Sequence, residues 1–302
     1  MFGPVGPYIK RRLLTDRGYE LYRPTELERK LIRSPFDDWF SKDIDLFAIV
    51  HRANRQALAE VPQWVRAEDL PGSLWRFGVP ERWDTGKLEL GMTELNEIEA
   101  DPTSSDLIAF ICHGLRNLRY LEIGVSVGKN FFQIARNFPK AKLVGLDIEK
   151  PNPVLAEALG LTFTETSSPI VQTVETLSGV DQEVRLTTYR SGNVTYVRGD
   201  QFRAETWNAM PQRFNFIFSD GVHSGRAVRS ELDFLLSAGL IDTSGPFVMY
   251  WDDLGNIEMQ SAFNDCAAKL RAAFGRGWHG VHWIHGTYGQ RRLNGLFSSE
   301  SI

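Results

Sequence analysis

The sequence predicts an α/β fold with a seven-stranded, mostly parallel sheet and helices on both faces. Two observations support this prediction. From about residue 105 onward, short apolar runs alternate with segments of helical periodicity, as in strands joined by crossover helices. The first apolar run is followed at once by two glycines and a helical segment, which is typical of a turn at the carboxyl edge of a parallel sheet.

The individual elements follow from the apolar runs and from the helical periodicity between them. Strands are expected at residues 120–123, 142–147, 194–198, 214–219, 246–251, 281–285 and 292–297. Helices are expected at residues 25–32, 44–60, 105–118, 130–137, 154–159, 225–238 and 259–274. The last two strands are predicted to form an antiparallel pair that closes the sheet.

Residues 1–100 and 101–302 are predicted to differ in kind. The first part is rich in Trp, Phe and Pro and has few strand signals, so we expect a mainly helical accessory region. It would serve as a substrate lid, as a dimer contact or simply as structural support. The second part contains the sheet. Within it, residues 151–193 are longer than a crossover requires, and we predict a loop-rich insertion there.

The composition excludes several function classes. The net charge is -4 and the one notable basic run is at residues 10–12, so nucleic acid is not an expected partner. No apolar stretch approaches the roughly 20 residues that cross a bilayer, and the amino terminus lacks the apolar core of a secretion signal. Cys112 and Cys266 have no metal-ligand spacing. We therefore expect a cytoplasmic protein with two core cysteines and no membrane partner.

The glycine turn lies in the segment from Tyr120 to Asn130. Glu122 is near the end of the strand, and Gly124 and Gly128 follow at a spacing unlike the G-x-G-x-x-G of dinucleotide-binding turns. Glycine lets a ligand lie directly against the backbone. A carboxylate at this turn repels a pyrophosphate and favours a cationic ligand. S-adenosylmethionine (SAM) is such a ligand, since it carries an ammonium and a sulfonium group.

This pattern resembles motif I of the class I SAM-dependent methyltransferases, whose sheet is Rossmann-like. The resemblance assigns the turn residues Glu122, Gly124, Ser126 and Gly128 to the cofactor site. Asp147 follows at the end of the next strand and can accept both ribose hydroxyls. Its position alone does not separate SAM from NAD, because both cofactors contain ribose.

The third strand ends in a further acidic turn that contains Asp200 and Gln201. It resembles the acidic loop of the same methyltransferases, whose Asp accepts a hydrogen bond from the adenine amino group. The alternative roles are structural, as a helix N-cap for Asp147 and as a turn residue for Asp200. Because three strand ends match in the expected order, we predict a SAM site here.

Three carboxylates follow the next two strands. Asp220 comes after the fourth strand, and Asp252 and Asp253 come after the fifth. If the two strands are neighbours, these side chains converge, and unpaired carboxylates at close range repel each other. A divalent cation removes the conflict, and an oxygen-only ligand set favours Mg²⁺ or Ca²⁺.

This arrangement resembles the metal-dependent O-methyltransferases of the catechol type. The run Asp220-Gly-Val-His223 and the pair Asp252-Asp253 are more similar to the branch that methylates sugar hydroxyls on macrolide and aminocoumarin antibiotics, and to cephalosporin-hydroxylase-like methyltransferases. The resemblance implies metal ligands at Asp220, Asp252 and Asp253. It also implies a general base at His223, where catechol-type enzymes have Lys.

Structural roles are the alternative for these residues too, since His223 and the Asp252-Asp253 pair also suit a turn or a helix cap. His279, His282 and His285 are spaced three apart, and residues three apart in a strand point to opposite faces. We therefore do not expect a zinc site there.

The sequence thus predicts a SAM-dependent methyltransferase in which Mg²⁺, or another hard divalent cation, assists O-methylation of a hydroxyl on a small molecule. A sugar or a secondary metabolite would be a suitable acceptor. His223, if neutral near pH 7, would take the proton at a hydroxyl oriented beside Asp220. Three alternatives stay open: a metal-independent or N-methyltransferase with the same SAM site, an NAD-binding oxidoreductase, and a non-catalytic ligand-binding module. A homo-oligomer formed through residues 1–100 is a further option.

Overall fold

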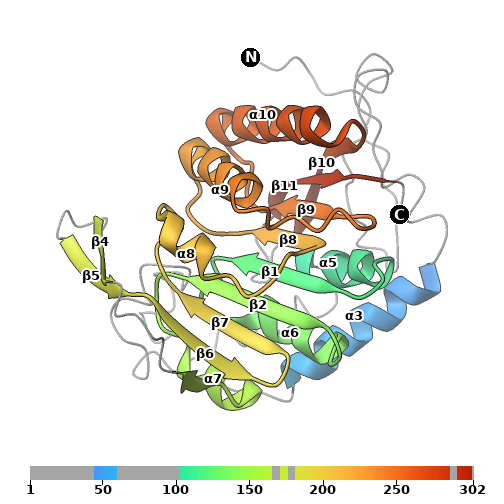
Figure 1. Ribbon diagram of the computed structural model, residues 1–302. Helices are drawn as coiled ribbons and strands as arrows, with labels where there is room; N and C mark the ends of the chain where they lie inside the picture. The colour runs from blue at the N-terminus through green and yellow to red at the C-terminus, as the bar shows by residue number, and fades with distance from the viewer. Residues whose placement is uncertain (1–43, 60–102, 165–170, 176–180, 286–290, 301–302) are drawn as a thin grey trace.

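The computed structural model describes residues 44–59, 103–164, 171–175, 181–285 and 291–300, and the structural statements that follow concern these residues. Its centre is a nine-stranded sheet with the strand order β10-β11-β9-β8-β1-β2-β7-β6-β3, and β4 and β5 form a separate hairpin (Figure 1). The strands are β1 (Arg119–Ile123), β2 (Lys142–Asp147), β3 (Thr162–Thr164), β4 (Val171–Glu175), β5 (Asp181–Arg185), β6 (Thr187–Ser191), β7 (Val194–Arg198), β8 (Phe216–Ser219), β9 (Val248–Trp251), β10 (Trp278–His285) and β11 (Arg291–Ser298).

The predicted α/β fold class is confirmed. Strands β9, β8, β1, β2 and β7 run parallel in this order, and β11 pairs antiparallel with both β9 and β10. The order β7-β2-β1-β8-β9 is that of doubly wound sheets, in which ligands bind beyond the carboxyl ends of the strands. All seven predicted strands are present, and the last two form the expected antiparallel pair.

The segment 151–193 contains more regular structure than the predicted loop-rich insertion. Strands β3 and β6 extend the sheet beyond β7, and the β4–β5 hairpin projects from the body of the molecule (Figure 1). Threonine recurs in this segment, and its branched side chain favours strands. The pairing of β6 with β7 brings this part of the insertion into the sheet.

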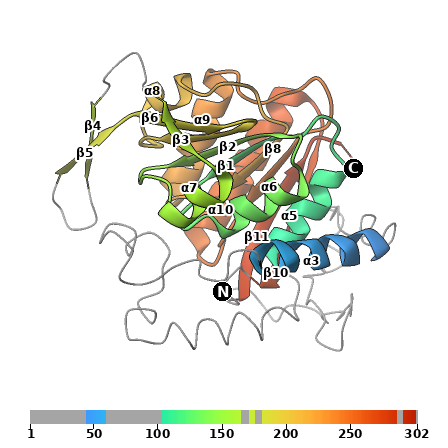
Figure 2. The same cartoon turned by 90° about the horizontal axis from the view of Figure 1, so that it is seen from below.

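Helices cover both faces of the sheet, as predicted (Figure 2). One face carries α3, α5, α6 and α7, and the other carries α8, α9 and α10. Their bounds are α3 (Ile44–Ala59), α5 (Ser104–His113), α6 (Lys129–Asn137), α7 (Pro153–Leu159), α8 (Ala204–Asn208), α9 (Gly225–Ser237) and α10 (Ile257–Phe274). None of the helices within the described ranges is long and apolar enough to span a membrane.

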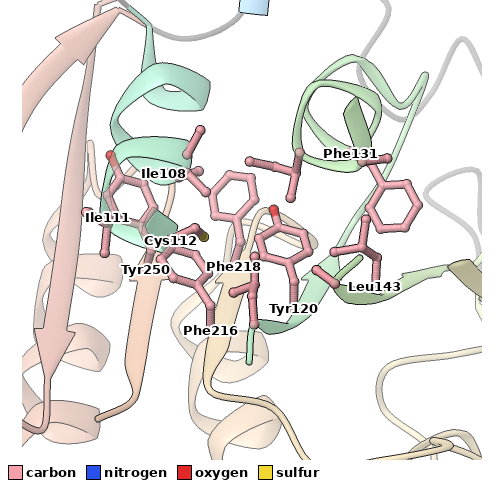
Figure 3. Close-up of a cluster of buried hydrophobic side chains, with 14 of the residues drawn as sticks. Ile108, Ile111, Cys112, Tyr120, Phe131, Leu143, Phe216, Phe218 and Tyr250 are labelled. Atoms are coloured by element: carbon pink, nitrogen blue, oxygen red, sulfur yellow. The ribbon is translucent and has the colours of Figure 1, made fainter. Parts of the chain in front are cut away.

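The core consists of two layers because successive strand residues point to opposite faces. Tyr120, Phe216 and Tyr250 pack with α5 and α6 on one face (Figure 3). Ile217 and Trp251 belong to the layer under α9 and α10. Each large apolar side chain that is buried in this way contributes roughly 1.5–3 kcal/mol. The sheet that carries the strand ends is therefore packed on both faces.

Helix α3 confirms the helix predicted at residues 44–60. A buried polar contact joins it to the domain, since Asp106 lies 2.8 Å from Nδ1 of His51 and accepts a hydrogen bond of 2.7 Å from Asn54. The helix predicted at residues 25–32, and most of the accessory region at 1–100, lie outside the described residues. Cys112 and Cys266 are free and buried, as expected.

Candidate functional site

The ends of five parallel strands meet at one edge of the sheet. Ile123 of β1 pairs in register with Ser219 of β8, and Ser219 pairs with Trp251 of β9. On the other side of β1, Ile123 pairs with Leu146, and Asp147 of β2 pairs with Arg198 of β7. The residues that follow these strands therefore lie side by side. Together with Glu122 in β1 and Asp147 at the end of β2, they include every residue that the sequence analysis assigned to a cofactor, a metal or catalysis.

The glycine turn is in direct contact with Asp220, the residue that follows β8. Gly124 has φ +83°, and a Cβ at this position would overlap the backbone carbonyl of Asp220. Gly128 has φ +87°, and its Cβ would overlap the side chain of Leu155. Both positions therefore require glycine for conformation and for space. The predicted cofactor turn thus lies directly against the predicted metal ligand.

Glu122 points into the protein. It is almost completely buried and accepts hydrogen bonds of 2.6 Å from the hydroxyl of Tyr120 and from Nδ2 of Asn130. Burial raises its pKa to about 8, so the carboxyl is largely protonated at neutral pH in the ligand-free protein. The sequence analysis treated Glu122 as a carboxylate. In the structure its hydrogen bonds join β1 to the start of α6.

Asp147 organises the turn from the neighbouring strand. Its Oδ2 accepts from the amide of Ser126 at 2.8 Å, and its Oδ1 accepts from the amide of Glu149 at 2.9 Å. Burial raises the pKa of Asp147 above its usual range. Each carboxylate oxygen still has a second lone pair, so these contacts leave acceptors for a pair of ribose hydroxyls.

The third acidic turn follows β7. Oδ1 of Asp200 accepts from the amide of Phe202 at 2.9 Å, and its Oδ2 lies 3.6 Å from Nε of Arg203. This turn role was the structural alternative considered for Asp200. Next to it, Nε2 of Gln201 is buried and has no hydrogen-bond partner among the described residues. A buried amide without a partner is costly and is consistent with a position that a ligand completes.

The acidic residues after β8 and β9 converge, as predicted. Ligand atoms of Asp220, His223 and Asp252 all lie within 4.8 Å of one another. This set differs from the predicted ligands, because His223 belongs to it and Asp253 does not. Asp253 has φ +50°, and its Oδ2 lies 3.4 Å from Nδ1 of His223. In this structure Asp253 is a partner of the imidazole.

His223 lies between two carboxylates. Its Nε2 is 3.1 Å from Oδ1 of Asp220, while Nδ1 faces Asp253. Burial alone lowers the pKa of His223, but the hydrogen bonds to Asp220 and Asp253 and the nearby negative charges outweigh it and raise the pKa to about 10. The imidazole is therefore cationic near pH 7 in this state. The sequence analysis required it to be neutral.

Asp252 is the most enclosed member of the group, at 4% exposed. Burial, followed by the charge of Asp220, raises its pKa to about 7. Its Oδ2 forms an ion pair with Nη1 of Arg292, and its Oδ1 has no hydrogen-bond partner among the described residues. A buried carboxylate oxygen without a partner is rare, and this oxygen is available as a donor to a cation.

Three functional candidates were missed by the sequence analysis. Arg292 reaches the site from β11, and Asn294 of the same strand accepts a hydrogen bond of 3.2 Å from the amide of Asp253. The sequence could have predicted the positions of Arg292 and Asn294, because an antiparallel last strand brings its amino end to the edge where the parallel strands finish. Lys129 directly follows the glycine turn, and burial lowers its pKa to about 7.

Two other residues that the sequence singled out have contacts away from this group. His282 faces the hydroxyl of Tyr250 at 2.8 Å, and His279 faces Nη1 of Arg271 at 3.0 Å. The side chain of His285 lies outside the described residues. Trp251, which directly precedes Asp252, packs in the core against Phe263.

No family model and no curated protein matches this chain. Solved structures with a similar fold include an O-methyltransferase from Bacillus cereus in complex with SAH, at 13% identity over 90% of this chain and 97% of that chain, with a TM-score of 0.39. An SAH-bound methyltransferase from Podospora anserina has 14% identity over 76% of this chain and 88% of that chain, with a TM-score of 0.40. The MycE methyltransferase of the mycinamycin biosynthetic pathway, in complex with Mg and SAH, has 17% identity over 62% of this chain and 46% of that chain, with a TM-score of 0.35.

These solved structures are methyltransferases, the class that the sequence motifs resemble. At such low identity and TM-score, the similarity concerns the general course of the chain. The assignment of activity depends on the site itself.

Proposed function

We propose that this protein is a SAM-dependent methyltransferase that methylates a hydroxyl group of a small molecule with the assistance of a hard divalent cation. One observation carries the proposal. The glycine turn lies against the backbone of Asp220, whose side chain belongs to the group with His223 and Asp252. A methyl donor on the turn and an acceptor at the acidic group would therefore be neighbours, as an in-line displacement requires.

The cofactor half of the proposal rests on the residues around the turn. The left-handed glycines let the turn pack closely against Asp220 and Leu155, and Asp147 offers a pair of carboxylate oxygens at the end of β2. Gln201 offers a buried amide at the end of β7. The turn lacks the G-x-G-x-x-G of dinucleotide sites, and the carboxyls of Glu122, Asp147 and Asp220 are close enough to influence one another. Glu122 is largely protonated, so the acidic neighbours that favour a sulfonium cofactor over a pyrophosphate are Asp147 and Asp220.

The acidic group fits a divalent cation. Asp220 and Asp252 would hold it through carboxylate oxygens, and the Oδ1 of Asp252 that has no partner among the described residues is a suitable donor. An oxygen-rich set with open positions is typical of Mg²⁺. When bound, such an ion lowers the pKa of an acceptor hydroxyl and orients it.

His223 is the proposed general base, and its environment sets a condition on that role. With both carboxylates in contact, the imidazole is protonated near pH 7. If Asp220 serves as a metal ligand, its charge is no longer available to His223, and the pKa of the imidazole falls. Asp253 at Nδ1 then holds the ring, and Nε2 is left to accept the hydroxyl proton. His223 can therefore act as a base only when a cation is bound at Asp220.

The surroundings of the group favour an amphipathic acceptor. Val222 and Ile257 are exposed apolar residues, and they lie on adjoining segments because Glu258 accepts a hydrogen bond from the amide of Gly225 at 3.0 Å. An acceptor with an apolar skeleton and neighbouring hydroxyls, such as a decorated secondary metabolite, would use both features.

The proposal predicts methyl transfer that depends on a metal. The purified protein is incubated with methyl-labelled SAM and a panel of polyhydroxylated small molecules, and label in the acceptor is measured with and without EDTA. We expect transfer to at least one hydroxyl, loss of transfer with EDTA and recovery with Mg²⁺. Transfer that survives EDTA would favour the metal-independent alternative, and transfer only to amines would favour an N-methyltransferase.

A further inference from the structure

Arg292 occupies the position between the two carboxylates that are the proposed metal ligands. Its Nη1 forms an ion pair with Oδ2 of Asp252 and lies 4.0 Å from Oδ1 of Asp220. The side chain comes from the amino end of β11, which runs antiparallel to β9 and so arrives at the strand ends. A permanent cation is thus part of the acidic group before any metal binds.

The guanidinium does not complete the environment of Asp252. The second oxygen of this carboxylate, Oδ1, is buried and has no hydrogen-bond partner among the described residues. A buried, hydrogen-bonded carboxylate normally uses both of its oxygens. Arg292 therefore neutralises the carboxylates of Asp220 and Asp252 only in part, and another cation could replace its guanidinium.

We infer that Arg292 is a built-in competitor of the divalent cation, and that the metal binds only when the guanidinium releases Asp252. This inference rests on the metal-dependent part of the proposed function. A metal ion at Oδ1 and a guanidinium at Oδ2 of the same Asp252 carboxylate would lie within a few ångströms of each other and repel strongly. Occupation by Arg292 and by the metal is for this reason mutually exclusive, and Arg292 sets the affinity of the site.

The structure offers the Arg292 side chain an alternative position outside the acidic group. Its side chain is 25% exposed, so it can reach solvent without crossing the core. Asp253 directly follows Asp252 in the chain and is 39% exposed. A released guanidinium can thus pair with Asp253 at the surface of the site.

The inference is tested with Mn²⁺ alone as the probe, because free Mn²⁺ is counted directly by electron paramagnetic resonance. Arg292→Gln removes the charge, and Arg292→Lys keeps it. Arg276→Gln is the matched control, since Arg276 forms an ion pair with Glu300 beyond the opposite end of β11. We expect Arg292→Gln to bind Mn²⁺ at least about tenfold more tightly than the unmodified protein, which corresponds to about 1.4 kcal/mol. Arg292→Lys and Arg276→Gln should stay within about threefold.

Equal or weaker Mn²⁺ binding by a folded Arg292→Gln variant would overturn the inference, because Arg292 would then support the ligands. If that variant does not fold, the unmodified protein gives a second test through phenylglyoxal modification, read by mass spectrometry. Labelling of Arg292 should increase at least about threefold when Mg²⁺ is added, and unchanged labelling would overturn the inference. SAM binding is measured on the same samples by calorimetry, so failure of the methyltransferase proposal is seen separately from failure of the competitor role.

Discussion

Replacing Gly124 with alanine is expected to abolish SAM binding and to lower the free energy of unfolding by about 2–5 kcal/mol. The residue has φ +83°, a conformation that costs an alanine about 1–2 kcal/mol. The new methyl group would also overlap the carbonyl oxygen of Asp220, and backbone cannot move aside as the end of a side chain can. Displacing it would disturb the turn and the acidic group together. Calorimetry with SAM and chemical denaturation measure the two effects.

Two other glycines serve as controls that separate the conformational cost from the steric overlap. Gly239 also has a left-handed backbone, with φ +62°, but a Cβ there meets nothing within 4 Å. Its alanine variant should therefore show only the conformational cost of about 1–2 kcal/mol. Gly245 has open space and no left-handed backbone, so its alanine variant should stay within about 0.5 kcal/mol. If Gly124→Ala lowers the free energy of unfolding no more than Gly239→Ala does and still binds SAM, the glycine turn does not contact the acidic group as described.

Replacing Asp220 with asparagine, or His223 with alanine, is expected to reduce turnover by at least about a hundredfold while SAM affinity stays within about threefold. Asp220 would lose a charged metal ligand, and the His223 variant would lose the proton acceptor. Within the described part of the chain, neither side chain contacts Asp147, so the proposed cofactor position of Asp147 and its hydrogen bond to the Ser126 amide should be retained. The two variants should differ in Mn²⁺ binding, which Asp220→Asn weakens much more strongly.

A second readout follows the imidazole itself. In Asp220→Asn, nuclear magnetic resonance should show the pKa of His223 falling from about 10 toward the unperturbed 6.5, because the nearest of its two carboxylates is neutralised. Asp265→Asn is the control, since Asp265 is an exposed residue of α10 paired with Arg229. Normal turnover in Asp220→Asn or in His223→Ala would contradict the role assigned to the replaced residue.

The positions of the site residues could be predicted because they follow from topology. Asp220 and Asp252 directly follow consecutive parallel strands, and these strands are neighbours in the sheet. The directions and partners of the side chains could not be predicted in the same way. Glu122 shares the face of Tyr120, two residues before it, and this alternation turns it toward Asn130 at the start of α6.

Contacts between segments distant in sequence explain the remaining differences. Arg292 changes the charge balance of the acidic group, yet it lies 40 residues after Asp252 and reaches it only through the pairing of β11 with β9. Similarly, β6 is a strand because it pairs with β7, whereas its own sequence is short and polar. Local patterns therefore located the strand ends, and tertiary pairing decided what surrounds them.

The central claim is that the glycine turn holds a sulfonium cofactor, and calorimetric titration of the unmodified protein with SAM and with NAD tests it most directly. We expect saturable binding of SAM with one site per chain and no measurable heat with NAD. Binding of NAD in the absence of SAM binding would contradict the claim and favour an oxidoreductase, and the absence of heat with either ligand would leave the turn without a cofactor role.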